Sequence, residues 1–192
     1  MTNQPDNPNR SDREKTRPSA LFPRTKRKSE TEDAVPLEAR IGQLLSERGL
    51  TVSAAESCTG GLILHCLTNI AGSSNYVMGG FVTYSNDAKM KFAQVSEKTL
   101  NEFGAVSEQT ALEMARGTRE AFGTSIAISV TGIAGPGGGT PTKPVGLTYV
   151  GLSAGDMERV AYYVWLGDRE ANKAHSAEAA LQLLFDYLTQ QE

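Results

Sequence analysis

Three side chains that could take part in catalysis follow one another in residues 55–61, which read AESCTGG: Ser57, Cys58 and Thr59. This segment stands between a predicted strand, residues 50–55, and a predicted helix, residues 62–67. Such a turn exposes a hydroxyl at the carboxyl end of a strand, where α/β proteins bind ligands. The N-terminus of the following helix offers free backbone N–H groups, which suit an oxyanion or a phosphate. The alternative is a capping turn, in which Ser57 or Thr59 only satisfies N–H groups of the helix.

A base for such a serine is sought in residues 83–89, which read TYSNDAK. An unpaired serine is a weak nucleophile and needs a neighbouring base. Neither His65, among apolar helical residues, nor His175, in a polar stretch, is placed to serve. A partly desolvated lysine could act instead, because burial lowers its pKa. Lys89 lies one turn into a helix predicted over residues 86–93 and could point back toward the serine; the alternative is a surface lysine.

A glycine-rich segment, residues 131–139, reads TGIAGPGGG and directly follows a predicted strand. Its five glycines allow the backbone to approach a ligand closely. The segment is neither a Walker A loop nor a dinucleotide-binding GxGxxG motif. Because a strand is predicted to follow it, we expect the loop to cover a site. The alternative is a flexible connection without a function of its own.

Strands alternating with helices must position these three segments. Hydrophobic periodicity, helix caps and turn residues define the elements. The expected strands are residues 50–55, 81–84, 126–130, 145–152 and 159–166, the last two joined by a turn at 154–156. The expected helices carry Leu37, Ile41, Leu44 and Leu45 (ended by Gly49), residues 62–67, residues 86–93, Ala111 to Phe122 (between Ser107 and Gly123), and Leu181 to Leu188. This order predicts an α/β sandwich around a mixed sheet.

The composition excludes several classes of protein. The 192 residues suggest one domain, and the net charge of −3 gives no reason to expect nucleic-acid binding. No apolar run approaches the roughly 20 residues of a membrane span, and the start lacks the apolar centre of a secretory signal. With two cysteines and no CxxC or HExxH motif, neither a disulfide scaffold nor a zinc site is expected. We therefore expect a cytoplasmic protein that binds no metal and no membrane.

The first 34 residues differ from the rest of the chain. They hold four of the eight prolines and 8 Lys/Arg against 6 Asp/Glu, and only Leu21 and Phe22 could be buried. So little apolar surface predicts a disordered polar tail over residues 1–34, followed by a domain over residues 35–192. The basic run 24–28 could touch an acidic partner; the alternative is a solvated tail.

Taken together, the three segments resemble the CinA carboxy-terminal domain family. The resemblance rests on residues 55–61, 80–86 and 131–136, with GAVSE at 104–108 and KPVG at 143–146, in the family's order and spacing. It runs from about residue 37 to 188. It implies a three-layer α/β/α sandwich around a mixed, mostly parallel sheet of about five strands. It also implies nicotinamide-nucleotide amidohydrolase activity, which converts nicotinamide mononucleotide to nicotinic acid mononucleotide and ammonia.

The same resemblance assigns roles to individual residues. Ser57 matches the proposed nucleophile, with Tyr84 and Lys89 as its activating partners. The residues expected to bind substrate are Cys58, Thr59, Gly60, Thr131, Gly132, Gly137, Gly138 and Arg169. The backbone N–H groups of residues 58–60 are expected to stabilise the oxyanion. No metal or organic cofactor is needed, the partner is a small-molecule nucleotide substrate, and the resemblance implies a homodimer.

Some alternatives stay open at this point. Members commonly carry another basic residue after Gly-Asp-Arg, whereas residues 170–173 read EANK here, so either Arg169 or Lys173 could hold the substrate phosphate. Cys58 competes with Ser57 as nucleophile, and only one of the two is expected to face the pocket. A catalytically silent nucleotide-sensing or protein-binding module, linked to competence or DNA damage, is the rival function. Larger members carry an amino-terminal pyrophosphatase-like domain, whose activity is not expected here.

Overall fold

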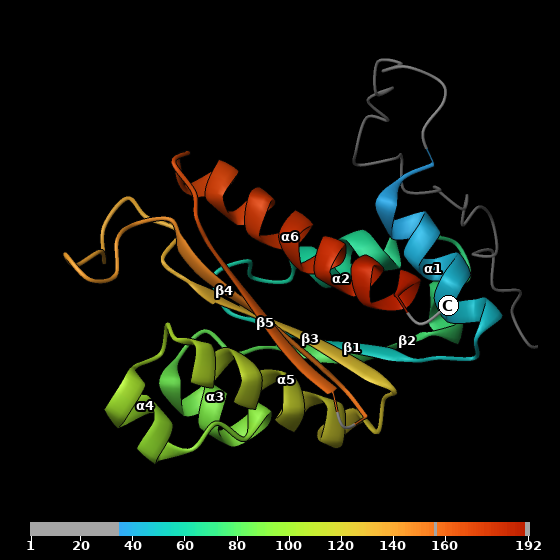
Figure 1. Cartoon of the computed structure of the whole chain (residues 1–192), viewed down its shortest axis with the longest axis horizontal. Helices are drawn as coiled ribbons and strands as arrows, with labels where there is room; N and C mark the ends of the chain where they lie inside the picture. The colour runs from blue at the N-terminus through green and yellow to red at the C-terminus, as the bar shows by residue number, and fades with distance from the viewer. Residues whose placement is uncertain (1–34, 156, 191–192) are drawn as a thin grey trace, which may run out of the picture. The chain divides into compact units, whose positions relative to one another are not determined.

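A computed structural model describes residues 35–155 and 157–190. The predicted tail over residues 1–34 lies outside these residues. The elements, labelled in Figure 1, are α1 (Leu37–Glu47), β1 (Val52–Glu56), α2 (Leu62–Thr68), the 3₁₀ turn η1 (Ser73–Asn75), β2 (Val77–Val82), α3 (Asn86–Ala93), α4 (Glu97–Phe103), α5 (Glu108–Phe122), β3 (Ile126–Gly132), β4 (Leu147–Ala154), β5 (Met157–Val164) and α6 (Arg169–Thr189).

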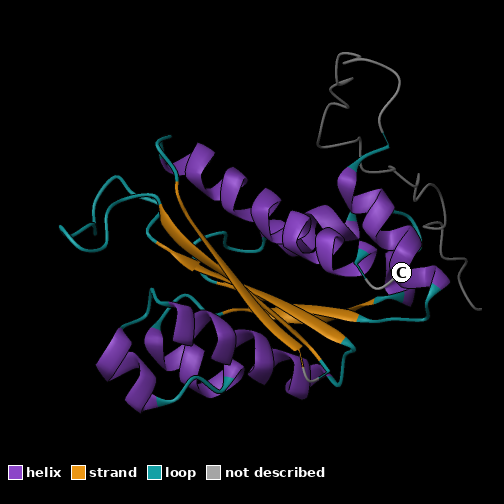
Figure 2. Cartoon of the chain, in the orientation of Figure 1, coloured by secondary structure: helices purple, strands orange, loops and turns teal. Residues whose placement is uncertain are grey.

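The five strands form one mixed sheet in the order β2-β1-β3-β4-β5. β1 pairs in parallel with both β2 and β3, while β4 is antiparallel to both β3 and β5. Four strands therefore run in one direction and only β4 runs in the other. Helices α1, α2 and α6 cover one face of the sheet, and α3, α4 and α5 cover the other (Figures 1 and 2). The expected three-layer α/β/α fold is confirmed.

The core lies on both faces of the central strands. All five residues of β1 are buried, as expected for a strand that pairs on both edges and is covered on both faces. On one face the fully buried side chains of Ile41 and Leu45 in α1 meet Leu184 and Leu188 in α6. Their spacing of four residues places each pair on one helical face, which is why the periodicity predicted these helices.

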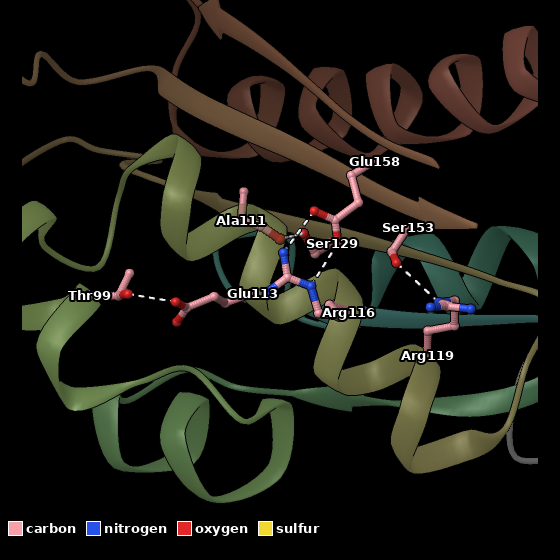
Figure 3. Close-up of polar contacts among 8 residues, drawn as sticks. All are labelled: Thr99, Ala111, Glu113, Arg116, Arg119, Ser129, Ser153 and Glu158. Atoms are coloured by element: carbon pink, nitrogen blue, oxygen red, sulfur yellow. Dashed lines mark hydrogen bonds and ion pairs between the residues drawn. The ribbon is translucent and has the colours of Figure 1, made fainter. Parts of the chain in front are cut away.

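Polar contacts hold α5 across three strands on the opposite face (Figure 3). The buried Ser129 hydroxyl donates to the Ala111 carbonyl at 2.6 Å. Arg116 forms a two-pronged ion pair with Glu158 at 2.8 and 2.7 Å, and Arg119 Nε donates to Ser153 Oγ at 3.0 Å. Since the ion pair is partly exposed, it contributes about 0–1 kcal/mol. The contacts fix the orientation of α5 more than they add stability.

Several strand boundaries differ from the sequence predictions: β1 begins at Val52 instead of residue 50, and β3 extends to Gly132 instead of residue 130. The strand expected at residues 81–84 is β2, Val77–Val82, so Tyr84 lies in the loop after it. The start of this strand has no clear sequence pattern because Gly79 and Gly80 carry no apolar side chains. Glycine is needed at residue 80, since a side chain there would collide with the Ala54 carbonyl of β1. The two strands of the hairpin are displaced by up to two residues, to Leu147–Ala154 and Met157–Val164.

Helix α4 was not predicted, and α6 is longer than predicted. α4 buries little apolar surface, so its pattern is weak. It is held by Glu113 of α5, whose carboxylate accepts from Ser96 N at 2.8 Å and Thr99 Oγ1 at 2.6 Å. α6 begins at Arg169, because the Asp168 side chain caps it by accepting from Ala171 N. Arg169 therefore lies in a first helical turn.

No helix in residues 35–155 and 157–190 is long and apolar enough to cross a membrane. The cytoplasmic location and the homodimer stay predictions.

Candidate active site

The closest approach between the predicted catalytic residues joins Ser57 to Lys89. Ser57 directly follows β1, and its N–H donates to Val130 O at 2.9 Å, which extends the β1–β3 pairing by one residue. Lys89 lies in α3, whose N-cap Ser85 accepts from Ala88 N. The Lys89 Nζ atom donates to Ser57 Oγ at 3.0 Å and to Thr83 O at 2.8 Å. Lys89 therefore points back toward the serine, as the sequence suggested.

Burial lowers the pKa of Lys89. The side chain is 2% exposed, and no carboxylate forms an ion pair with it in the described part of the chain. Loss of water around the ammonium therefore lowers its pKa, and charge on Cys58 acts in the opposite direction. That opposing effect needs a thiolate, but burial raises the pKa of the Cys58 thiol to about 11. Near neutral pH the thiol is uncharged, so the effect of burial on the pKa of Lys89 dominates. A larger fraction of Lys89 is therefore neutral than of an exposed lysine.

A cavity of about 260 Å³ surrounds this contact. It brings together nine of the predicted site residues: Ser57, Cys58, Tyr84, Lys89, Thr131, Gly132, Gly137, Gly138 and Arg169. The other lining residues were not among the expected site residues: Asn86, Ala105, Val106, Ile133, Ala134 and Gly135. Five of them lie in the motifs GAVSE and TGIAGP, and Asn86 ends the motif over residues 80–86, so the motifs themselves were the available signal. The cavity lies beyond the carboxyl ends of β1 and β3, as expected for an α/β fold.

Tyr84 and Lys89 form hydrogen bonds to different residues. Tyr84 is 64% exposed, and its hydroxyl accepts from Arg169 Nη2 at 2.9 Å. Arg169 Nη1 also donates to Gly135 O at 2.7 Å. Within the described residues Tyr84 has no hydrogen bond to Ser57 or Lys89. The structure thus joins Lys89 to the serine, and Tyr84 to the arginine and the glycine-rich loop.

Two predicted substrate-binding residues do not line the cavity. Thr59 is fully buried, and its hydroxyl has no partner among the described residues. Gly60 lies in the turn with a φ of 66°, a conformation that favours glycine. Thr131 does line the cavity, but its hydroxyl already donates to Ala105 O at 2.6 Å. Gly60 has a conformational role in the turn, whether or not its N–H group contacts a ligand.

The start of α2 is not the free anion site that the sequence suggested. Glu56 is fully buried, and its carboxylate accepts from the N–H groups of Gly61, Ile63 and Leu64 at 2.8, 3.2 and 2.9 Å. The donors at the helix start are therefore occupied. The N–H groups of residues 59 and 60 precede the helix and have no acceptor among residues 35–155 and 157–190, whereas the Cys58 N–H donates to its own sulfur. Any oxyanion would be bound by this turn.

Replacing Glu56 by alanine is expected to lower the free energy of unfolding by about 3 kcal/mol or more. The change leaves three backbone donors without an acceptor, and each buried unpaired group costs about 1–3 kcal/mol. Urea unfolding would measure the loss. As a control, Glu102→Ala on the exposed side of α4 should change stability by less than about 0.5 kcal/mol. Equal effects of the two substitutions would contradict the role of Glu56.

Ser57 and Cys58 both line the cavity, contrary to the expectation that only one would face it. Only Ser57 contacts Lys89. Burial raises the pKa of the Cys58 thiol, with a smaller contribution from the charge of Glu56, which is the opposite of what activation by a helix N-terminus would give. The geometry favours Ser57 as nucleophile.

The family model described as the CinA C-terminal domain matches residues 34–188. The chain belongs to this family. A CinA-like protein of Chloroherpeton thalassium is 53% identical to this CinA domain over 158 residues, which cover 80% of this chain and 38% of that relative. A CinA-like protein of Syntrophotalea carbinolica is 49% identical, covering 79% and 37%. The chain therefore spans less than two fifths of the length of these curated relatives.

Solved structures show the same fold. The competence/damage inducible protein CihA from Agrobacterium tumefaciens is 46% identical, with a TM-score of 0.75 over 80% of this chain and 93% of that one. The competence damage-inducible protein A from Klebsiella pneumoniae is 33% identical, with a TM-score of 0.78 over 81% and 97%. The resemblance found in the sequence is thus confirmed at the level of family and fold. These names refer to competence and damage and state no reaction.

Proposed function

We propose that this CinA domain is a nicotinamide-nucleotide amidohydrolase that converts nicotinamide mononucleotide to nicotinic acid mononucleotide and ammonia. One observation carries the proposal: a buried lysine lies 3.0 Å from a serine hydroxyl in the wall of a cavity. A nucleophile beside a base is what amide hydrolysis through an acyl-enzyme requires. Binding alone would not need this pair, which argues against a catalytically silent module. The substrate itself is inferred from the family resemblance.

Acylation begins with the neutral amine of Lys89. After the ammonium loses a proton, the Ser57 O–H donates to the Nζ lone pair, while the amine keeps its bond to Thr83 O. Ser57 Oγ attacks the carboxamide carbon as its proton passes to Nζ. The N–H groups of residues 58–60 stabilise the oxyanion, and removing one such donor typically costs about 3–4 kcal/mol. Lys89 then gives its proton to the leaving nitrogen, and ammonia departs.

Deacylation repeats the same proton transfers with water. Lys89, neutral again, takes a proton from a water molecule as the water oxygen attacks the ester carbon. The tetrahedral intermediate collapses, the bond to Ser57 Oγ breaks, and Lys89 returns the proton to the serine. The product is a carboxylic acid, which ionises. The hydrogen bond from Nζ to Thr83 O keeps the amine in place through both halves of the reaction.

The substrate phosphate is proposed to lie between Arg169 and Lys173. The two residues are one turn apart on α6, and both line a second cavity of about 540 Å³ that shares Arg169 with the first. Lys173 Nζ lies 3.8 Å from the position that a Cβ atom of Gly60 would occupy, beside the turn that carries Ser57. If the nicotinamide ring occupies the first cavity, the phosphate would lie near its rim, where both Arg169 and Lys173 could bind it. Lys173 supplies the basic residue expected after Gly-Asp-Arg.

Ammonia release from purified protein given nicotinamide mononucleotide tests this function. We expect release that stops when Ser57 is replaced by alanine, and weaker release from nicotinamide riboside, which lacks the phosphate. The Ser57→Ala variant is the matched control for contaminating amidases. Binding of the mononucleotide without ammonia release, at neutral and mildly alkaline pH, would instead support a nucleotide-binding module without chemistry.

A further inference from the structure

The side chain of Asn172 connects three parts of the chain beside the cavity. It lies in the first turns of α6 and is only 1% exposed. Its amide nitrogen donates to Ala134 O in the glycine-rich loop at 3.1 Å, and its amide oxygen accepts from Gly167 N at 3.0 Å. Both halves of the amide are therefore used, one toward the loop and one toward the segment that leads into α6.

The next residue of the loop is held by the same helix. Gly135 O accepts from Arg169 Nη1 at 2.7 Å, directly after the carbonyl that Asn172 binds. Ala134, Gly135 and Arg169 all line the cavity, whereas Asn172 stands behind them. Two successive loop carbonyls thus depend on two side chains of α6. Asn172 can influence a ligand only through the loop and the arginine.

We propose that Asn172 is a positioning residue that holds the glycine-rich loop and Arg169 in the arrangement that binds the nucleotide. The pairing needs one donor and one acceptor in a short side chain. Leucine supplies neither, and glutamine is longer by one methylene in a site without free space. Aspartate has the right shape, but as a carboxylate it places an acceptor against Ala134 O. Only the kinetic part of the test rests on the proposed amidohydrolase function.

Hydrogen exchange tests the proposal without any reaction. The N–H groups of Ile133 and Gly146, at the two ends of the loop, are protected by hydrogen bonds to Leu147 O and Ile133 O. In Asn172→Asp we expect both amides to exchange about tenfold faster at neutral pH, as expected from the loss of one buried hydrogen bond. Asn101→Asp, the same change on the exposed α4, should leave both rates unchanged. Unchanged exchange in Asn172→Asp would overturn the proposal.

The pH dependence separates positioning from a general packing defect. Burial raises the pKa of a carboxylic acid, and the protonated acid can again donate to Ala134 O. The exchange difference between Asn172→Asp and the unmodified protein should therefore shrink as the pH falls through that raised pKa. Asn172→Leu has no such group, so its difference should persist. A defect in Asn172→Asp that does not change with pH would contradict the hydrogen-bond argument.

Kinetics supply the functional readout. With nicotinamide mononucleotide we expect Asn172→Asp to raise KM by about tenfold and to change kcat by less than about threefold, since a misplaced loop weakens binding in ground and transition states alike. Ser57 and Lys89 are carried by the β1 turn and α3, to which Asn172 does not bond. A kcat loss with unchanged KM would overturn the proposal. If the unmodified protein releases no ammonia, the proposed function fails, and hydrogen exchange still decides the role of Asn172.

Discussion

Replacing Lys89 by arginine is expected to lower kcat about 10²- to 10⁴-fold, almost as much as replacing it by alanine. Arginine keeps the positive charge, but its pKa is above about 12, so it cannot accept the Ser57 proton near neutral pH. If Lys89 only attracted the substrate phosphate, arginine would substitute well and kcat would survive. Ammonia release at saturating nicotinamide mononucleotide measures the difference.

Two controls separate proton transfer from misfolding in the Lys89 variants. Lys91→Arg, two residues further along α3 on its exposed side, should keep near-normal kcat. Lys89→Ala should recover part of its activity when a small primary amine is added, since the amine can enter the vacated space and accept the proton. Near-normal kcat in Lys89→Arg would remove Lys89 from the proton-transfer role and leave Tyr84 as the candidate base.

The pH profile should carry the signature of the same lysine. The base is the neutral amine, so activity should rise with pH as Lys89 loses its proton. Because burial lowers the pKa of Lys89, this rise should come at lower pH than the roughly 10.4 of an ordinary lysine. In Lys89→Ala the rise should be absent. A profile that is flat through neutral and mildly alkaline pH would contradict a lysine base.

Replacing Ser57 by alanine should lower kcat by at least about 10³-fold, whereas Cys58→Ala should keep kcat within about tenfold of the unmodified protein. Only the serine contacts Lys89, and the Cys58 thiol has a pKa raised to about 11. Near neutral pH that thiol is therefore almost fully protonated and a poor nucleophile. Initial rates of ammonia release from both variants provide the comparison.

Two further measurements support the assignment of the nucleophile. Ser57→Ala should still bind nicotinamide mononucleotide, which isothermal titration calorimetry can measure. Iodoacetamide should alkylate Cys58 slowly at neutral pH, because the thiolate is the reactive form. Loss of turnover in Cys58→Ala, together with survival in Ser57→Ala, would transfer the nucleophile role to the cysteine.

Local signals in the sequence determined most of the elements and the segments that form the site. Ser107 and Gly123 mark the ends of α5 because a side-chain cap and a left-handed glycine act within one helical turn. The glycine-rich loop was recognisable from its composition, and the turn that carries Ser57 from its position after a strand. These features depend only on neighbouring residues. The motifs in register then indicated the family before any contact was known.

Only the tertiary structure decided which of these residues meet. Ser57 and Lys89 are 32 positions apart, and their contact depends on β1 lying between β2 and β3, which brings α3 to the end of β1. The family resemblance assigned Tyr84 as a partner of the serine, whereas in the structure its hydroxyl accepts from Arg169, 85 positions away. No role was expected for Glu56, yet its buried carboxylate accepts hydrogen bonds from the N–H groups at the start of α2. Such partners are set by burial and strand order, which act between distant parts of the chain and leave no local pattern.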